Sequence, residues 1–112
     1  FVHLGDGGII GKRTDGSLYV VSGPDNGITS AYTWLTTSQS ALSHVQIGFG
    51  NVTKYNRMVM FSDGATEICK GNTINSHAAV LIEKSKDHSA IYEYVKGRHN
   101  MDDTSVVMID VL

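Results

Sequence analysis

The pattern of apolar and polar positions divides the chain into extended segments followed by a helical region. The clearest apolar run is Met58 to Phe61, which has the length of a strand and stops abruptly at Ser62-Asp63-Gly64. A short, continuous apolar run bounded by turn residues is typical of a buried strand. The sequence therefore predicts a central strand that delivers a carboxylate at its end.

A β-hairpin is expected near the start of the chain. Residues 9–13 and 17–21 are β-prone and flank Thr14-Asp15-Gly16. An Asp-Gly pair between such segments is the strongest short-range hairpin signal. Further extended segments are expected at residues 1–4, at 30–37, at 44–49, where polar and apolar positions alternate, and at 105–112.

Beyond Glu67 the periodicity changes from that of a strand to that of a helix. Apolar positions in residues 74–82 recur at i, i+4, i+7 and i+8, and Asn72 or Thr73 could provide the N-cap. Asp87 is expected to cap a second helix, which would stop at Gly97. The inward face of this helix would carry Ile91, Tyr94 and Val95. Strands, a helix pair and a returning strand predict an α+β chain.

Composition and charge limit the class of function. The 112 residues form one domain at most, with 41% apolar and 18% charged residues, as in an ordinary globular chain. The net charge of -2 and the scattered basic residues give no attraction to nucleic acid or to an anionic membrane. Cys69 is the single cysteine and has no internal disulfide partner, which fits a reducing cytoplasm.

Three short acidic stretches stand at the ends of expected strands. Gly5-Asp6-Gly7-Gly8 follows the first strand, Ser62-Asp63-Gly64 with Glu67 follows the central one, and Met101-Asp102-Asp103-Thr104 precedes the last. Carboxylates at three strand ends are the layout expected where a sheet converges on a hard divalent cation. Each aspartate also has a structural alternative, as a helix cap or a turn residue.

In their order and spacing, the three stretches resemble the C-terminal half of metal-dependent PP2C-type (PPM) serine/threonine phosphatases, over nearly the whole chain. The resemblance implies part of a PP2C-like α-β-β-α sandwich, with mainly antiparallel strands and a helix pair, that is incomplete on its own. Because Phe1 already lies in an apolar run, we expect residues 1–112 to be the C-terminal portion of one phosphatase domain within a longer polypeptide. In the family, the N-terminal half carries the aspartate that bridges the metals and an arginine that binds phosphate, and no position here matches either.

The resemblance also implies a chemistry. In the family, two Mg²⁺ or Mn²⁺ ions, with a third in some members, hold a water that attacks phosphorus in line, so no protein side chain becomes covalent. The implied substrate is phosphoserine or phosphothreonine in a protein, and the implied partner is the missing N-terminal half or a second copy of the chain. The positions carried over are Asp63 and Asp102 as direct metal ligands, Asp6 and Glu67 at a more loosely held metal, and Gly64 and Gly7 as metal-adjacent backbone.

Other functions are left open by the residues. The runner-up is a catalytically dead PP2C-like module kept for regulation or protein interaction, although intact Asp6, Asp63 and Asp102 argue against it. A third is a cation-binding domain without phosphatase activity. The five histidines show no two-His metal spacing and are expected to lie at the surface or half-buried. A hydrolase triad built from Ser22 and His44 is rejected, because no nucleophile elbow surrounds the serine.

Overall fold

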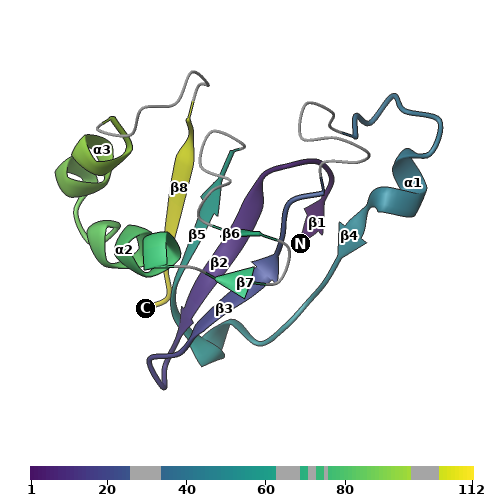
Figure 1. The fold of residues 1–112 in the computed structure, drawn as a ribbon. Coiled ribbons are helices and arrows are strands. Elements are labelled where there is room, and N and C mark those ends of the chain that lie inside the picture. Colours follow the sequence, from purple (N-terminus) through teal and green to yellow (C-terminus); the bar gives the residue numbers. More distant parts are fainter. Residues whose placement is uncertain (26–33, 63–68, 71–72, 75, 97–103) are drawn as a thin grey trace.

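The computed structural model describes residues 1–25, 34–62, 69–70, 73–74, 76–96 and 104–112. Its centre is a four-stranded antiparallel sheet with the order β3-β2-β5-β8 (Figure 1). Two short antiparallel pairs, β1-β4 and β6-β7, stand beside it. The strands are β1 (Val2–His3), β2 (Gly8–Arg13), β3 (Leu18–Ser22), β4 (Gln46–Ile47), β5 (Tyr55–Phe61), β6 (Cys69–Lys70), β7 (Thr73–Ile74) and β8 (Val106–Asp110). The helices are α1 (Ala41–His44), α2 (Ser76–Lys84) and α3 (His88–Lys96), with a 3₁₀ turn at Val52–Lys54. The chain is thus α+β, as predicted.

The hairpin that the Asp-Gly pair predicts joins β2 to β3. Asp15 Oδ1 accepts hydrogen bonds from the Ser17 amide at 2.8 Å and from the Ser17 hydroxyl at 2.6 Å. Gly16 has a φ of +87°, which side-chain-bearing residues rarely adopt. The turn is therefore determined by local sequence alone.

The core lies between one face of the sheet and the helix pair α2 and α3 (Figure 1). Val20, Ile10 and Val59 lie side by side across β3, β2 and β5, and Phe61 follows Val59 on the same face. Leu81, Ile82 and Ile91 of the helices pack against this row. Fully burying one such side chain contributes about 1.5–3 kcal/mol, so this layer dominates the stability of the chain.

The helix boundaries correct one prediction and confirm another. Ile74 belongs to β7, where it pairs with Cys69, and helix α2 begins only at Ser76. The predicted cap at Thr73 is therefore wrong, because this β-branched residue pairs with Lys70 in the β6-β7 pair instead. Asn72 lies outside the described residues. The predicted cap of α3 is confirmed, since Asp87 Oδ1 accepts a hydrogen bond from the Ser89 amide at 3.0 Å.

The other face of the sheet departs from the expected full burial of the central strand. Val59 and Phe61 are 0% and 5% exposed, whereas Met60 between them is 41% exposed. Alternate side chains of a strand point to opposite faces, and the helices cover only one of them. We call the other side the open face; its members are Tyr19, Met58, Met60, Val107 and Ile109.

Residues 34–47, which include α1 and β4, form an arm on the side of the molecule away from α2 and α3 (Figure 1). It is joined to the N-terminus by the β1-β4 pair and by Phe1, whose amino group donates to the Gly48 carbonyl at 2.7 Å. Residues 36–37 are in a turn, so the extended segment expected at 30–37 is wrong in its described part. The segment expected at 44–49 is confirmed at β4, whereas His44 ends α1 instead. The Ser38 hydroxyl accepts from the Leu35 amide at 3.1 Å, a local bond that competes with strand formation.

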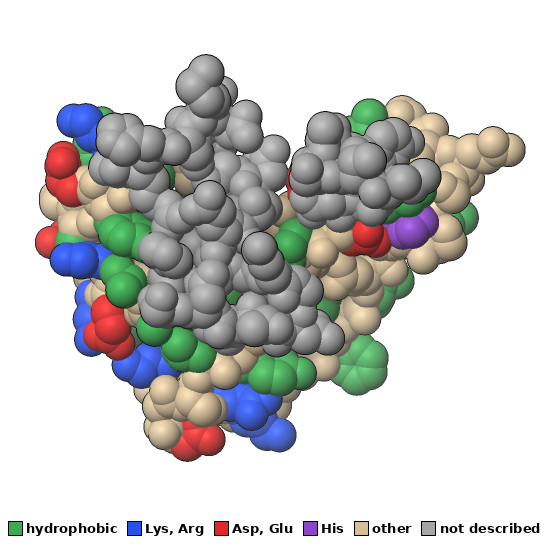
Figure 2. All heavy atoms as spheres, viewed as in Figure 1, with side chains coloured by type: hydrophobic (Ala, Val, Ile, Leu, Met, Phe, Trp, Pro, Cys, Tyr) green, Lys and Arg blue, Asp and Glu red, His purple; other side chains and the backbone are tan. Residues whose placement is uncertain are grey.

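On the face shown in Figure 2, acidic and basic side chains are interleaved. Within the described ranges, no helix is both long and apolar enough to cross a membrane.

Candidate functional site

The three acidic stretches are anchored at the same end of the central sheet. Gly8 of β2 lies opposite Phe61 of β5, and Phe61 lies opposite Val106 of β8. The loop before β2, the segment after β5 and the segment before β8 therefore leave the sheet side by side. This is the convergence of strand ends that the sequence predicts.

Two reciprocal hydrogen bonds join Ser62 of the second stretch to Ser105, which follows the third. The Ser62 amide donates to the Ser105 carbonyl at 3.0 Å, and the Ser105 amide donates to the Ser62 hydroxyl at 2.9 Å. Ser62 directly precedes Asp63, and Ser105 follows Asp102-Asp103-Thr104. The serine of the Ser-Asp-Gly motif is thus a structural clamp between the two strand ends.

The first stretch, Gly5-Asp6-Gly7, is shaped by its approach to β5. A Cβ atom at Gly7 would stand 2.7 Å from the carbonyl oxygen of Phe61, too close for any side chain without a backbone shift. Gly5 has a φ of +108°, again a conformation suited to glycine. The two glycines hold Asp6 beside the end of β5.

A cavity of about 400 Å³ lies at this end of the sheet, and we call it the site cavity. Asp6 is half-buried in its wall. Polar groups of the first two stretches and Ser105, which follows the third, contribute to the lining, with apolar residues of β1, β2, β5 and β8 around them. The lining residues with polar side chains or close backbone are His3, Asp6, Gly7, Ser62 and Ser105.

The structure describes two of the six predicted site residues. Asp6 and Gly7 line the site cavity, whereas Asp63, Gly64, Glu67 and Asp102 lie outside the described residues. In the part of the chain that is described, no group of three or more His, Cys, Asp or Glu side chains is placed to hold a metal ion. The one carboxylate in the cavity wall provides oxygen atoms, the ligand type of Mg²⁺ and Mn²⁺.

A polar network beside the cavity was not anticipated from the sequence. The Ser22 hydroxyl donates to Gln46 Oε1 at 2.8 Å and lies 2.7 Å from His3 Nδ1. Burial lowers the pKa of His3, although the carboxylates of Asp6 and Asp25 act in the opposite direction. Ser22 is only 2% exposed. Its hydroxyl joins β3 to His3 of β1 and to Gln46 of β4. This supports the rejection of Ser22 as a nucleophile.

Asp25 is a second residue whose role the sequence did not reveal. It lies in the Gly23-Pro24-Asp25 segment, for which the sequence predicts only a loop of turn-forming residues. In the structure its carboxylate contacts both Trp34 and His44 of the arm. Contacts between positions 9 and 19 residues apart leave no local sequence pattern, so no signal was available to find them.

Comparison with known proteins agrees with this geometry. A family model described as "Protein phosphatase 2C" matches residues 1–103, a range that contains all three acidic stretches up to Asp103. No curated protein and no solved structure matches the chain. Because the family match covers most of the sequence, the chain belongs to the protein phosphatase 2C family.

Proposed function

We propose that the protein containing this chain hydrolyses phosphoserine and phosphothreonine in proteins in a reaction that depends on Mg²⁺ or Mn²⁺, and that this chain supplies part of the site. Family membership supports the phosphatase class. The observation that carries the proposal is the clamp between Ser62 and Ser105, together with the contact of Gly7 against Phe61. These contacts bring together the strand ends next to the three acidic stretches, and Asp6, Ser62 and Ser105 line one cavity there.

The cation would be held by carboxylate oxygens. Asp6 lines the site cavity and supplies one such group. Asp63, Glu67 and Asp102 are proposed to supply the others, Asp63 and Asp102 to the tightly held ions and Glu67, with Asp6, to a looser one. When bound, such ions neutralise phosphoryl oxygens and make water a stronger nucleophile.

The remaining polar residues of the cavity would orient the ligands. Ser62 and Ser105 fix the spacing between the ends of β5 and β8. Gly7 lets its backbone approach within contact distance of Phe61, which sets the position of Asp6 relative to β5. A fixed arrangement of carboxylates lowers the reorganisation needed when a cation or a phosphoryl group enters.

The open face supports a proposal about the partner. Met60, Val107 and Ile109 are 41%, 55% and 39% exposed, and a second cavity of about 650 Å³ runs along this face and the neighbouring residues 47–55. An exposed apolar sheet face favours association with another surface. We propose that the N-terminal half of the domain packs here, or in its absence a second copy of the chain.

The test is a metal-dependent assay on the protein that contains this chain. Asp63→Ala and Asp102→Ala should each lower the rate of p-nitrophenyl phosphate hydrolysis by at least about 10–100-fold, the range seen when even an outer metal contact is lost. Asp110→Ala is the control, since Asp110 is an exposed carboxylate at the opposite end of β8. A phosphothreonine peptide in place of p-nitrophenyl phosphate tests the substrate class. Unchanged rates in both site variants would overturn the proposal.

A further inference from the structure

Asp25 connects the first acidic stretch to the arm. Its backbone amide donates to the carbonyl oxygen of Gly5 at 2.8 Å. Gly5 immediately precedes Asp6 and has a φ of +108°, which glycine adopts without strain. The backbone of Asp25 therefore helps to hold the loop that carries Asp6 in its conformation.

The side chain of Asp25 holds the arm at two points. Its Oδ2 atom lies 2.9 Å from His44 Nδ1, and its Oδ1 atom accepts from Trp34 Nε1 at 3.3 Å. The rings of Trp34 and His44 stack with centroids 3.7 Å apart and planes 14° apart. The Asp25 and His44 side chains are 34% and 30% exposed, so the pair is partly shielded from water.

A second set of contacts links the arm to the strands beside the site cavity. Gln46 in β4 donates to the Gly23 carbonyl at 2.8 Å and accepts from Ser22 at 2.8 Å. Ser22 in turn contacts His3, which lines the cavity with Asp6. The arm is thus attached at two points next to Asp6, through Asp25 at Gly5 and through Gln46 and Ser22 at His3.

We propose that Asp25 is a positioning residue that couples cation binding at Asp6 to the packing of the Trp34–His44 stack. The inference rests on the proposed function, because it takes Asp6 as a metal ligand. Coupling between two sites is reciprocal: if the docked arm favours the loop conformation that binds the cation, the cation favours the docked arm by the same factor. Asp25 contacts both the loop that carries Asp6 and the Trp34–His44 stack of the arm, and through it the cation and the stack affect each other.

The chain carries its own reporter for this coupling, because Trp34 is its single tryptophan. We suggest ¹⁹F NMR of the full protein labelled with 5-fluorotryptophan, with the Trp34 signal assigned from a Trp34→Phe variant. Mg²⁺ is the probe, since it is diamagnetic, and its affinity is measured in parallel by calorimetry. Added Mg²⁺ should shift the Trp34 signal with the same midpoint as the calorimetric titration, and Asp6→Asn should abolish or weaken both.

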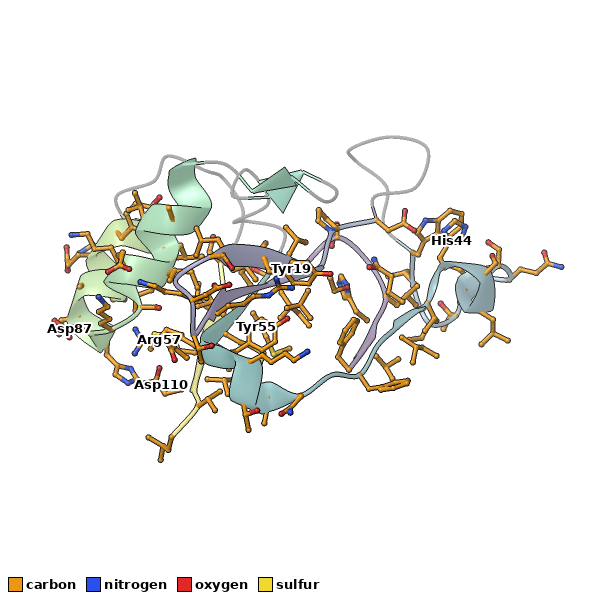
Figure 3. All side chains as sticks on the ribbon, turned by 90° about the horizontal axis from the view of Figure 1, so that it is seen from below. Tyr19, His44, Tyr55, Arg57, Asp87 and Asp110 are labelled. Carbon is orange, nitrogen blue, oxygen red and sulfur yellow. The ribbon has the colours of Figure 1, made fainter. Side chains whose placement is uncertain are left out.

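Two variants of the arm contact separate coupling from a purely structural role. Asp25→Asn keeps the backbone bond to Gly5 but removes the charge that faces His44, and should weaken Mg²⁺ binding about tenfold and remove the shift of the Trp34 signal. His44→Gln alters only the arm and should weaken Mg²⁺ binding in the same direction. Asp110→Asn is the matched control: it breaks the ion pair with Arg57, far from His44 in Figure 3, and should change neither readout.

The outcomes are distinguishable. Mg²⁺ binding that is sensitive to Asp6→Asn, with a static Trp34 signal and unchanged affinity in Asp25→Asn and His44→Gln, overturns the coupling and leaves the proposed function intact. A wild-type protein that binds no Mg²⁺ overturns both. If Asp25→Asn does not fold, His44→Gln alone decides the question.

Discussion

Ser62 and Ser105 exchange two hydrogen bonds just beyond the last paired residues of β5 and β8. One of them uses the Ser62 hydroxyl as acceptor, so this side chain has a structural task beside the site cavity. The bond extends the pairing of the two strands toward the acidic stretches. The spacing between the ends of β5 and β8 therefore depends on a side chain as well as on the sheet.

Ser62→Ala should loosen this junction. The backbone bond remains, but the Ser105 amide loses its acceptor, at a cost of about 0.5–1.5 kcal/mol in the free energy of unfolding. The Mn²⁺ concentration needed for half-maximal turnover should rise by about tenfold, because the ligand positions are less fixed. Ser17→Ala is the control: it removes a hydroxyl bond in the β2-β3 turn and should change stability alone. A Mn²⁺ requirement equal to that of the wild type would show that the clamp does not position the site.

Alanine substitutions at Gly7 and Gly16 should both lower stability, but only the one at Gly7 should impair metal binding. Gly7→Ala places a Cβ atom 2.7 Å from a backbone oxygen, and since neither group is a mobile side chain, we expect a loss of about 1–3 kcal/mol in stability together with impaired metal binding. Gly16→Ala meets no atom within 4 Å and suffers only from its φ of +87°, a cost of about 1–2 kcal/mol. Thermal unfolding and metal titration of both variants test this. Metal binding that is equally affected in both would contradict it.

Glu83 should contribute to the pH dependence of the free energy of unfolding. Hydrogen bonds from Lys12 and Lys86, at 2.6 and 2.5 Å, lower the pKa of Glu83 from 4.5 to about 2. A carboxyl whose folded pKa is depressed stabilises the fold above its unfolded pKa and loses that contribution as pH falls through the folded one. Glu83→Gln should therefore be less stable than wild type at pH 7, with the difference fading between about pH 4.5 and pH 2. Denaturant titrations at several pH values measure this, and high salt should shrink the difference, since the group is exposed.

Local signals account for the parts of the fold that the sequence predicts correctly. The Asp15-Gly16 turn and the Asp87 cap are each formed by residues within three positions of one another, so their chemistry is visible in a short window. The sequence predicted that strand ends converge because its apolar runs begin or end at acidic residues. Ile74 was misassigned because its spacing from Leu81 fits a helix, whereas its actual partner is Cys69.

Long-range contacts account for what the sequence could not predict. Asp25 and His44 are 19 positions apart, and Ser22 and Gln46 are 24 apart, and nothing in the residue types says that they meet. The sequence also could not show that only one face of β5 is buried. Apolar residues on both faces of a strand predict that both faces are buried. Whether they are depends on which elements pack against the strand.

The open face gives the last prediction, which concerns assembly. Met60 is 41% exposed between Ile9 and Val107 in the neighbouring strands, at the centre of that face. If the 112-residue chain by itself self-associates through this surface, or binds the complementary N-terminal half there, Met60→Lys should weaken association by at least about tenfold. Burying an unpaired charge costs more than the roughly 1.4 kcal/mol that corresponds to this factor. Folding should be little affected, because the lysine side chain reaches water when the face is free.

The control for this prediction is another exposed apolar residue. Leu42 on α1 is 92% exposed and belongs to the arm rather than to the central sheet, so Leu42→Lys should leave association unchanged. Light scattering across a concentration series measures the association of both variants, and circular dichroism measures their folding. A wild-type chain that stays a well-folded monomer at high concentration and does not bind the N-terminal half would show that the open face has no partner. Equal weakening by both variants would show that the effect is not specific to the open face, because only Met60 belongs to it.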